Sequence, residues 1–414
     1  MVKKFMFTYL MMWNKIIFTV LTFILGNCLL AQQSTVDQVL RQVINDNRLL
    51  NVEQQLSYYR SNSFKSPALR ELELRVRGND FDSSPDNYSL RFGILNPKER
   101  MANNLFDLAK EGYLVKTKEY LLNEIFSEKY QGLINNYNLI KSRFLILEEK
   151  RQIKAYELSQ KEMLALNDWI KLDQTLLELE LKQADFESLI NTKNSELLIN
   201  DSSFINVNWN EFDLISLDKI KTTIELHSPQ SNSLEIDLAS EKFRLDQLKL
   251  DIDYAKSWNI GFVQAGYDTK GVGSLRNQMD YRVGITIPLF NEDKPKLRRE
   301  ELNLLGAEGE LKWLKKTNAL VDRKRMKDFY DLVFRYEMLK QKEKELSNLA
   351  TEGVNGIEGF LALSKYMTTV KKSLHKTFIK ILLLYIEILE KKGILGAKPY
   401  LNYLSNELNS FTLN

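Results

Sequence analysis

The sequence predicts a mainly α-helical chain with a membrane β-barrel portion, in which a twofold internal repeat places two strand pairs between long coiled-coil hairpins. Three observations lead to this expectation. Only 7 prolines and 17 glycines occur among 414 residues, which favours long helices with few turns. Long stretches space their apolar residues with a helical or heptad period. Four short stretches instead alternate apolar and polar residues, as strands do.

Residues 1–31 have the layout of a secretory signal peptide. Lys15 precedes a continuous apolar run over residues 16–25, and Ala31 supplies a small residue before a polar stretch. The run is too short for a convincing membrane-spanning helix. Cys28 leaves lipid attachment after cleavage open as an alternative. The start of translation also stays open between Met1, Met11 and Met12.

The charge balance argues against nucleic-acid binding. The chain has 58 basic and 55 acidic residues, and the expected signal peptide holds three lysines and no acid. The mature chain is therefore formally neutral, whereas a nucleic-acid partner requires a basic face. If Cys28 leaves with the signal peptide, no cysteine remains for a disulfide or a thiolate metal site.

The first repeat is expected over residues 32–205. It comprises a helix over 35–60, strands over about 71–78 and 88–95, and a helical segment over 98–198. Asn96-Pro97 ends the strand pair and begins the helical segment, and a reversal is expected within residues 163–168. After the reversal, two heptad series that start at Trp169 and Leu172 predict a coiled-coil seam.

The second repeat is expected over residues 206–400 and has the same order of elements. It comprises further helices, strands over about 258–267 and 281–290, and a long helical hairpin that begins at Pro295. Its last helix again has heptads, and Gly393 and Gly396 are expected to end it. Residues 401–414 remain as a C-terminal tail. We consider this duplication the most informative feature of the sequence.

The alternation of side chains predicts two different faces for the strands. The polar face is expected to carry Glu73, Arg75, Arg77, Arg282 and Thr286. The apolar face is expected to carry Leu72, Leu74, Val76, Leu90, Phe92, Val283, Ile285 and Ile287. The strands have about the length that crosses a bilayer when tilted. The polar residues can therefore line a barrel lumen, or they can be the solvated face of an ordinary sheet.

Four strands are too few to close a barrel, and open strand edges do not occur in lipid. A membrane sheet of this kind must therefore be shared with copies of the same chain. Aromatic residues flank the two loops between the strands, which suits an interfacial girdle. These aromatic residues are Phe81, Tyr88, Tyr267 and Tyr281.

The chain resembles the TolC-type outer-membrane efflux proteins in the sequence of residues 283–291, together with the signal peptide, the repeat and the strand pairs between coiled-coil helices. The resemblance implies a homotrimer in which each chain contributes four strands to a shared barrel in contact with outer-membrane lipid. It implies helices that extend into the periplasm and partners there, a periplasmic adaptor and an inner-membrane transporter. The implied function is an exit duct of a tripartite efflux or secretion system.

Residues 351–361 resemble the turn at the periplasmic tip of this family. The family narrows its entrance with an acidic pair one helical turn apart, but the matching positions here hold Gly359 and Ala362. The candidate tip residues are Asp168, Glu352, Gly353 and Glu358. The alternative interpretation of Glu352 and Glu358 is that they are solvated turn residues.

The sequence contains no motif for an enzyme or a cofactor. No nucleophile elbow, phosphate loop or cysteine motif is present. The two histidines, His227 and His375, are far apart in the sequence, which argues against a metal site built on both. The alternative to a duct is a secreted coiled-coil scaffold of the cell envelope, in which the strands form a small cap or docking sheet.

Overall fold

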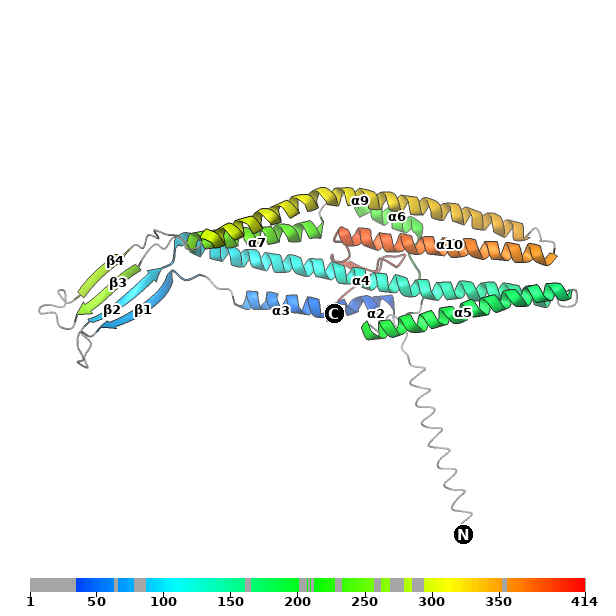
Figure 1. Cartoon of the computed structure of the whole chain (residues 1–414), viewed down its shortest axis with the longest axis horizontal. Helices are drawn as coiled ribbons and strands as arrows, with labels where there is room; N and C mark the ends of the chain where they lie inside the picture. The colour runs from blue at the N-terminus through cyan, green and yellow to red at the C-terminus, as the bar shows by residue number, and fades with distance from the viewer. Residues whose placement is uncertain are drawn as a thin grey trace, which may run out of the picture.

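The computed structural model of the chain is an elongated helical body that carries a small sheet at one end (Figure 1). It describes residues 35–62, 66–77, 87–160, 165–200, 207, 209, 212–227, 233–256, 262–268, 279–284, 294–351 and 356–413. The expected signal peptide, with Met1, Met11, Met12 and Cys28, lies outside these residues. The prediction of a mainly α-helical chain is confirmed.

Two long helices run along the body, and each is followed by a shorter helix that returns beside it (Figure 1). Helix α4 (Pro97–Gln160) is followed by α5 (Leu166–Asn200), and α9 (Lys294–Thr351) is followed by α10 (Gly356–Lys391). Helix α4 ends at Gln160 and α5 begins at Leu166, so the start of the second helix lies inside the expected window of residues 163–168. Both reversals lie at the end of the body opposite the sheet, which we call the tip.

The four strands form one antiparallel sheet in the order β1-β2-β3-β4. The strands are β1 (Leu69–Arg77), β2 (Asn87–Ile94), β3 (Phe262–Asp268) and β4 (Met279–Gly284). Both ends of β1 and β2, the end of β3 and the start of β4 lie within two residues of their expected positions. The described part of β3 begins, and that of β4 ends, inside the expected range. The pair β1-β2 and the pair β3-β4, which are far apart in the sequence, meet where β2 pairs with β3.

The first predicted helix is wrong in one respect, because it is interrupted. Helix α2 (Val36–Arg41) and a 3-10 turn (Gln42–Asn45) precede α3 (Asn47–Ser61). Asp46 has an extended backbone, and its carboxylate accepts a hydrogen bond from the backbone N–H of Arg48 at 2.8 Å. An aspartate in this position ends one helical run and caps the next, because its side chain satisfies a free N–H group of the new helix.

The main core lies in the middle of the body. Fully buried side chains from α2, α4 and α10 meet there with α6 (Leu217–His227) and with the C-terminal tail. The tail forms a two-stranded sheet of β5 (Tyr400–Leu401) and β6 (Ser410–Phe411). The hydroxyl of Tyr130 in α4 donates to the carbonyl of Leu401 at 2.8 Å and accepts from the N–H of Tyr403. The tail is thus a part of the core, which the sequence did not indicate.

The apolar run over residues 379–386 packs within the bundle. Ile379, Ile381, Leu382, Tyr385 and Ile386 are all buried. Helix α10 ends at Lys391, and Gly393 follows with a φ of 70°, a conformation that suits a helix-ending glycine. None of the described helices is both long and apolar enough to span a membrane.

Candidate functional site

The register of the sheet places the predicted polar residues on one face. Directly opposite residues of an antiparallel pair project to the same face, so each chain of partners is a row across the sheet. One row is Glu73, Arg91, Gln264 and Arg282, which we call the arginine row. The next row on this face is Arg75, Ser89, Gly266 and Asp280, and Arg77 follows beside Asn87. Thr286 lies outside the described residues.

The opposite face is apolar in every described row. Its three rows are Leu72, Phe92, Val263 and Val283; Leu74, Leu90, Ala265 and Tyr281; and Val76, Tyr88, Tyr267 and Met279. The predicted apolar residues of β1, β2 and β4 therefore lie together. Ile285 and Ile287 lie outside the described residues. A shift of one residue in the pairing of any strand would place its polar side chains on the apolar face, because side chains alternate along a strand.

The apolar face is open to its surroundings in the single chain. Leu72 is 64% exposed, Leu74 65% and Val283 78%. Monomeric soluble proteins rarely expose a contiguous apolar surface of this kind, and such surfaces mark contact with a membrane or a partner. The face is therefore built to be covered by something other than the described parts of its own chain.

The polar face is held by ion pairs between neighbouring residues. Arg75 binds the Glu73 carboxylate through two nitrogens, at 2.8 and 2.9 Å. Arg282 donates to Asp280 at 2.7 Å. Arg91 reaches the Glu73 carboxylate only at 3.7 Å, and its guanidinium lies 3.9 Å from the ring centre of Phe262. The face is thus charged but largely compensated within the sheet.

Phe262 is an aromatic residue on the polar face, and sequence reasoning did not assign it a role. It lies opposite Gly284 of β4, and its ring occupies the space that a side chain at that position would need. Glycine at 284 therefore allows the ring to lie flat on the sheet, where it supports Arg91 by a cation–π contact.

Both edges of the sheet are open. Within the described residues, β1 and β4 each have one hydrogen-bonded neighbour, β2 and β3 respectively. Unpaired backbone groups on an edge strand are a template for pairing with another chain.

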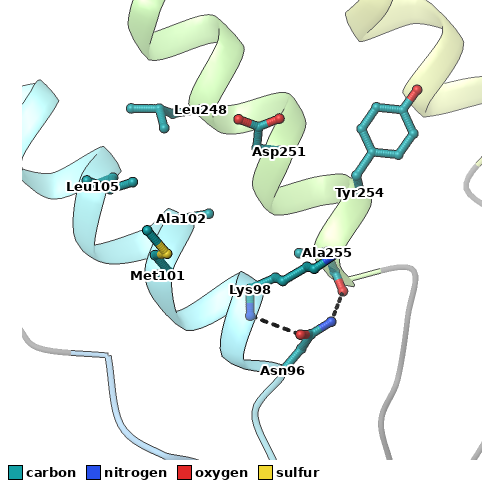
Figure 2. A pocket seen from close by; sticks show the side chains of 9 residues that line it. All are labelled: Asn96, Lys98, Met101, Ala102, Leu105, Leu248, Asp251, Tyr254 and Ala255. Carbon is teal, nitrogen blue, oxygen red and sulfur yellow. Dashed lines mark hydrogen bonds between the residues drawn. The ribbon is translucent and has the colours of Figure 1, made fainter.

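A cavity of about 640 Å³ lies between α4 and α7 (Leu234–Lys256) at the foot of the sheet (Figure 2). Asn96 closes one end of it, because its side chain donates to the carbonyl of Ala255 at 3.1 Å and accepts from the N–H of Lys98 at 3.0 Å. These two bonds cap α4 and fix it to the end of α7, so they hold both strand pairs at one level. Met101, which lines the cavity, is 65% exposed.

The tip has a small core of its own. Its buried residues are Ile153, Leu172, Leu176, Leu179 and Ile357 from α4, α5 and α10. Next to them the rings of Tyr156 and Phe360 stack, with centroids 3.9 Å apart. Leu172 therefore lies in the predicted seam, whereas Trp169 is 47% exposed in the single chain.

An ion pair joins the two reversals at the tip. The Lys171 ammonium of α5 lies 2.6 Å from the Glu358 carboxylate of α10. Hydrogen bonding to Lys171 lowers the pKa of Glu358, and the same bond raises the pKa of Lys171. Asp168 lies in the first turn of α5, whereas Glu352 and Gly353 lie outside the described residues. Lys171 was missed from the sequence, where nothing separates it from other helix lysines.

The described residues contain no group of three or more histidine, cysteine, aspartate or glutamate side chains that could hold a metal ion. His375 instead lies at 3.0 Å from the Asn138 side chain and against the ring of Tyr137.

The structure is similar to solved outer-membrane proteins. The outer membrane protein VceC from Vibrio cholerae has a TM-score of 0.56 at 12% identity, over 86% of this chain and 96% of that one. The outer-membrane channel OprN has a TM-score of 0.55 at 11% identity, over 86% and 89%. The Campylobacter jejuni CmeC outer membrane channel has a TM-score of 0.52 at 11% identity, over 90% and 87%. The sequence matches no protein-family model, and no curated protein matches it.

At this level of identity the similarity identifies the fold. It extends over most of the length of both chains. The chain therefore has the fold of the TolC-type outer-membrane channels, as the sequence predicts.

Proposed function

We propose that the chain is the outer-membrane exit duct of a tripartite efflux or secretion system. Three copies would each contribute β1 to β4 to one closed barrel of twelve strands, and the helices would continue as a hollow cylinder in the periplasm. The observation that carries this proposal is the sheet, which combines one exposed apolar face, one polar face and two open edges.

The two faces support a barrel in lipid. In a transmembrane barrel, apolar side chains face the lipid and polar ones face the lumen. On this account Leu72, Leu74, Val76, Leu90, Phe92 and Val283 contact lipid, and so do Ile285 and Ile287. Glu73, Arg75, Arg77 and Arg282 line the lumen together with Thr286. The ordinary two-sided sheet is the less favoured alternative, because its apolar face would need a cover.

The open edges support an assembly of copies. Closure requires β1 of one copy to pair with β4 of the next, since a barrel in lipid has no free edge. The helices below the sheet offer matching apolar surfaces, because Met101 and Leu108 of α4 and Leu302 and Leu305 of α9 are each more than 60% exposed. Contact between these surfaces in neighbouring copies would cover them.

The order of elements supports the twofold repeat. In each half, two strands lead into a long helix and then a returning helix. We propose units over residues 32–205 and 206–400, which would have arisen by duplication. The tail over residues 401–414 then closes the core that both units share.

The tip is the proposed site of contact with the periplasmic adaptor and, through it, the inner-membrane transporter. Asp168 and Glu358 lie there with Lys171. Glu352 and Gly353 belong to the same expected turn as Glu358, over residues 351–361. Solutes would pass through the duct without a chemical step, so no catalytic residue is assigned. The signal peptide of residues 1–31 would direct the chain across the inner membrane.

Cell fractionation tests this proposal against the secreted scaffold. The duct should be recovered in the outer membrane, and its mass after mild detergent extraction should equal three chains. Purified protein should also conduct ions in a planar lipid bilayer. Recovery of a soluble monomer from the periplasm would support the scaffold and overturn the duct.

A further inference from the structure

Arg91 is the one arginine of the described polar face whose guanidinium carries an unpartnered buried nitrogen. Its Nε is buried without a hydrogen-bond partner in the described structure. The Glu73 carboxylate, which lies 3.7 Å away, is already bound by two nitrogens of Arg75. The positive charge of Arg91 is therefore only weakly compensated.

The surroundings of Arg91 hold it in place on the polar face of the sheet. The ring of Phe262 supports the guanidinium from the sheet, and Gly284 makes room for that ring. Gln264 is directly opposite Arg91 in the register, and Arg282 follows Gln264 in the same row. The row thus offers two guanidinium groups and one amide beside the Glu73 carboxylate, and the ring of Phe262 lies in the adjacent row towards the helices.

The charges of this row are unequal. The arginine row contains Arg91 and Arg282 against Glu73, so it has one excess positive charge in each chain. The neighbouring rows towards the loops pair one arginine with one aspartate each, and Glu71 in the row nearest the helices is negative. The described polar face as a whole is neutral. Any preference for an anionic solute must therefore arise locally, at the arginine row.

We infer that the arginine row is a specificity belt for anionic solutes that carry a flat apolar part. A carboxylate or sulfonate would bind the guanidinium of Arg91, and the face of an aromatic group beside it would contact the edge of the Phe262 ring, because the guanidinium lies over the ring itself. Charge-assisted hydrogen bonds from arginine to an oxyanion are strong, and an aromatic ring edge packs well against the face of a flat aromatic partner. The inference rests on the proposed function, because only a duct directs this face towards passing solutes. Three copies would repeat the belt around one ring.

Binding of pyranine, an aromatic trisulfonate, tests the belt directly. We expect the full-length protein in detergent to bind pyranine at low salt, as measured by fluorescence anisotropy. Arg91→Gln should weaken binding about tenfold, the loss expected for one charge-assisted hydrogen bond. Phe262→Leu should weaken it less, because the anion contact remains. Arg323→Gln, at an exposed position of α9 outside the sheet, removes the same charge and should change nothing.

Conductance separates failure of the belt from failure of the duct. In a bilayer under a potassium chloride gradient, Arg91→Gln should shift the reversal potential towards cation preference relative to the unaltered protein. A conducting protein whose pyranine binding and reversal potential are the same with and without Arg91 would overturn the belt and leave the duct intact. A protein that neither inserts nor conducts would overturn the duct. Arg91→Lys keeps the charge and should fold. It therefore keeps the test valid if Arg91→Gln misfolds.

Discussion

The middle of the helical body and the sheet use apolar side chains in opposite ways. In the middle, Phe126, Tyr130 and Ile381 are fully buried by other parts of the same chain. In the sheet, Leu72, Leu74 and Val283 are mostly exposed although they form a continuous face. The difference shows that the chain completes its own core in the middle and leaves the sheet incomplete. On the proposed function, lipid and further copies would complete the sheet, whereas the middle needs neither.

The largest effect on stability is expected in the middle. Phe126→Ala removes a fully buried ring that packs against Tyr130, Tyr400 and Phe411, and should lower the free energy of unfolding by about 3–5 kcal/mol. Thermal unfolding of purified protein measures this loss. Phe334→Ala is the matched control, because that ring is 65% exposed, and it should cost much less. Equal losses at both positions would contradict a main core that buries Phe126 and leaves Phe334 outside it.

The second effect concerns the apolar face of the sheet. Leu74→Lys places a charge on the proposed lipid side and should oppose membrane insertion by about 2–4 kcal/mol near the bilayer middle. Asn87→Lys adds the same charge on the polar face and should be tolerated. The yield of assembled protein in the outer membrane is the measurement. If both variants insert equally well, the assignment of faces is wrong.

The third effect is a pH dependence in the helical body. Burial lowers the pKa of His375, so the folded chain keeps this imidazole neutral at a pH where the unfolded chain protonates it. Stability should therefore fall as the pH drops below the ordinary histidine value of about 6.5. His375→Gln should reduce this dependence in unfolding scans between pH 7.5 and 5.5. His227, whose pKa burial also lowers, should contribute to the same dependence, so the variant that lacks both histidines should show the least of it.

The smallest effect on stability is expected at the ion pair of the tip. Lys171→Gln removes the contact to Glu358, but exposed ion pairs contribute little because solvent screens them. The unfolding temperature should stay within experimental error. Leu172→Ala, one residue away and fully buried, should lower it clearly. A large loss from Lys171→Gln would mean that the tip depends on charge and not on packing.

The sequence predicted the parts of the fold that follow local rules. Alternation from Leu72 to Arg77 depends only on the period of a strand, and the cap at Asn96 depends on adjacent residues, so both were accessible. The break at Asp46 was missed because a capping aspartate inside a helical pattern is a weak signal. The tail with Tyr403 and Phe411 was missed because its partners in α4 are far away in the sequence.

The candidate site was predicted to a similar extent. The residues on each face of β1 followed from alternation, but Arg91 and Phe262 were not singled out. Their importance depends on the pairing of β2 with β3, which brings together residues 171 positions apart. Lys171 was missed at the tip for the same reason, because its partner Glu358 belongs to the other half of the chain.

Imaging the purified full-length particle in detergent by electron cryo-microscopy tests the central claim most directly. The account predicts a particle with threefold symmetry, in which twelve strands close around a lumen that continues into a helical cylinder. The polar face of each sheet should line that lumen, with Arg91 and Phe262 in adjacent rows. A monomer, or an assembly whose sheets stay open or direct their apolar faces inward, would contradict the account.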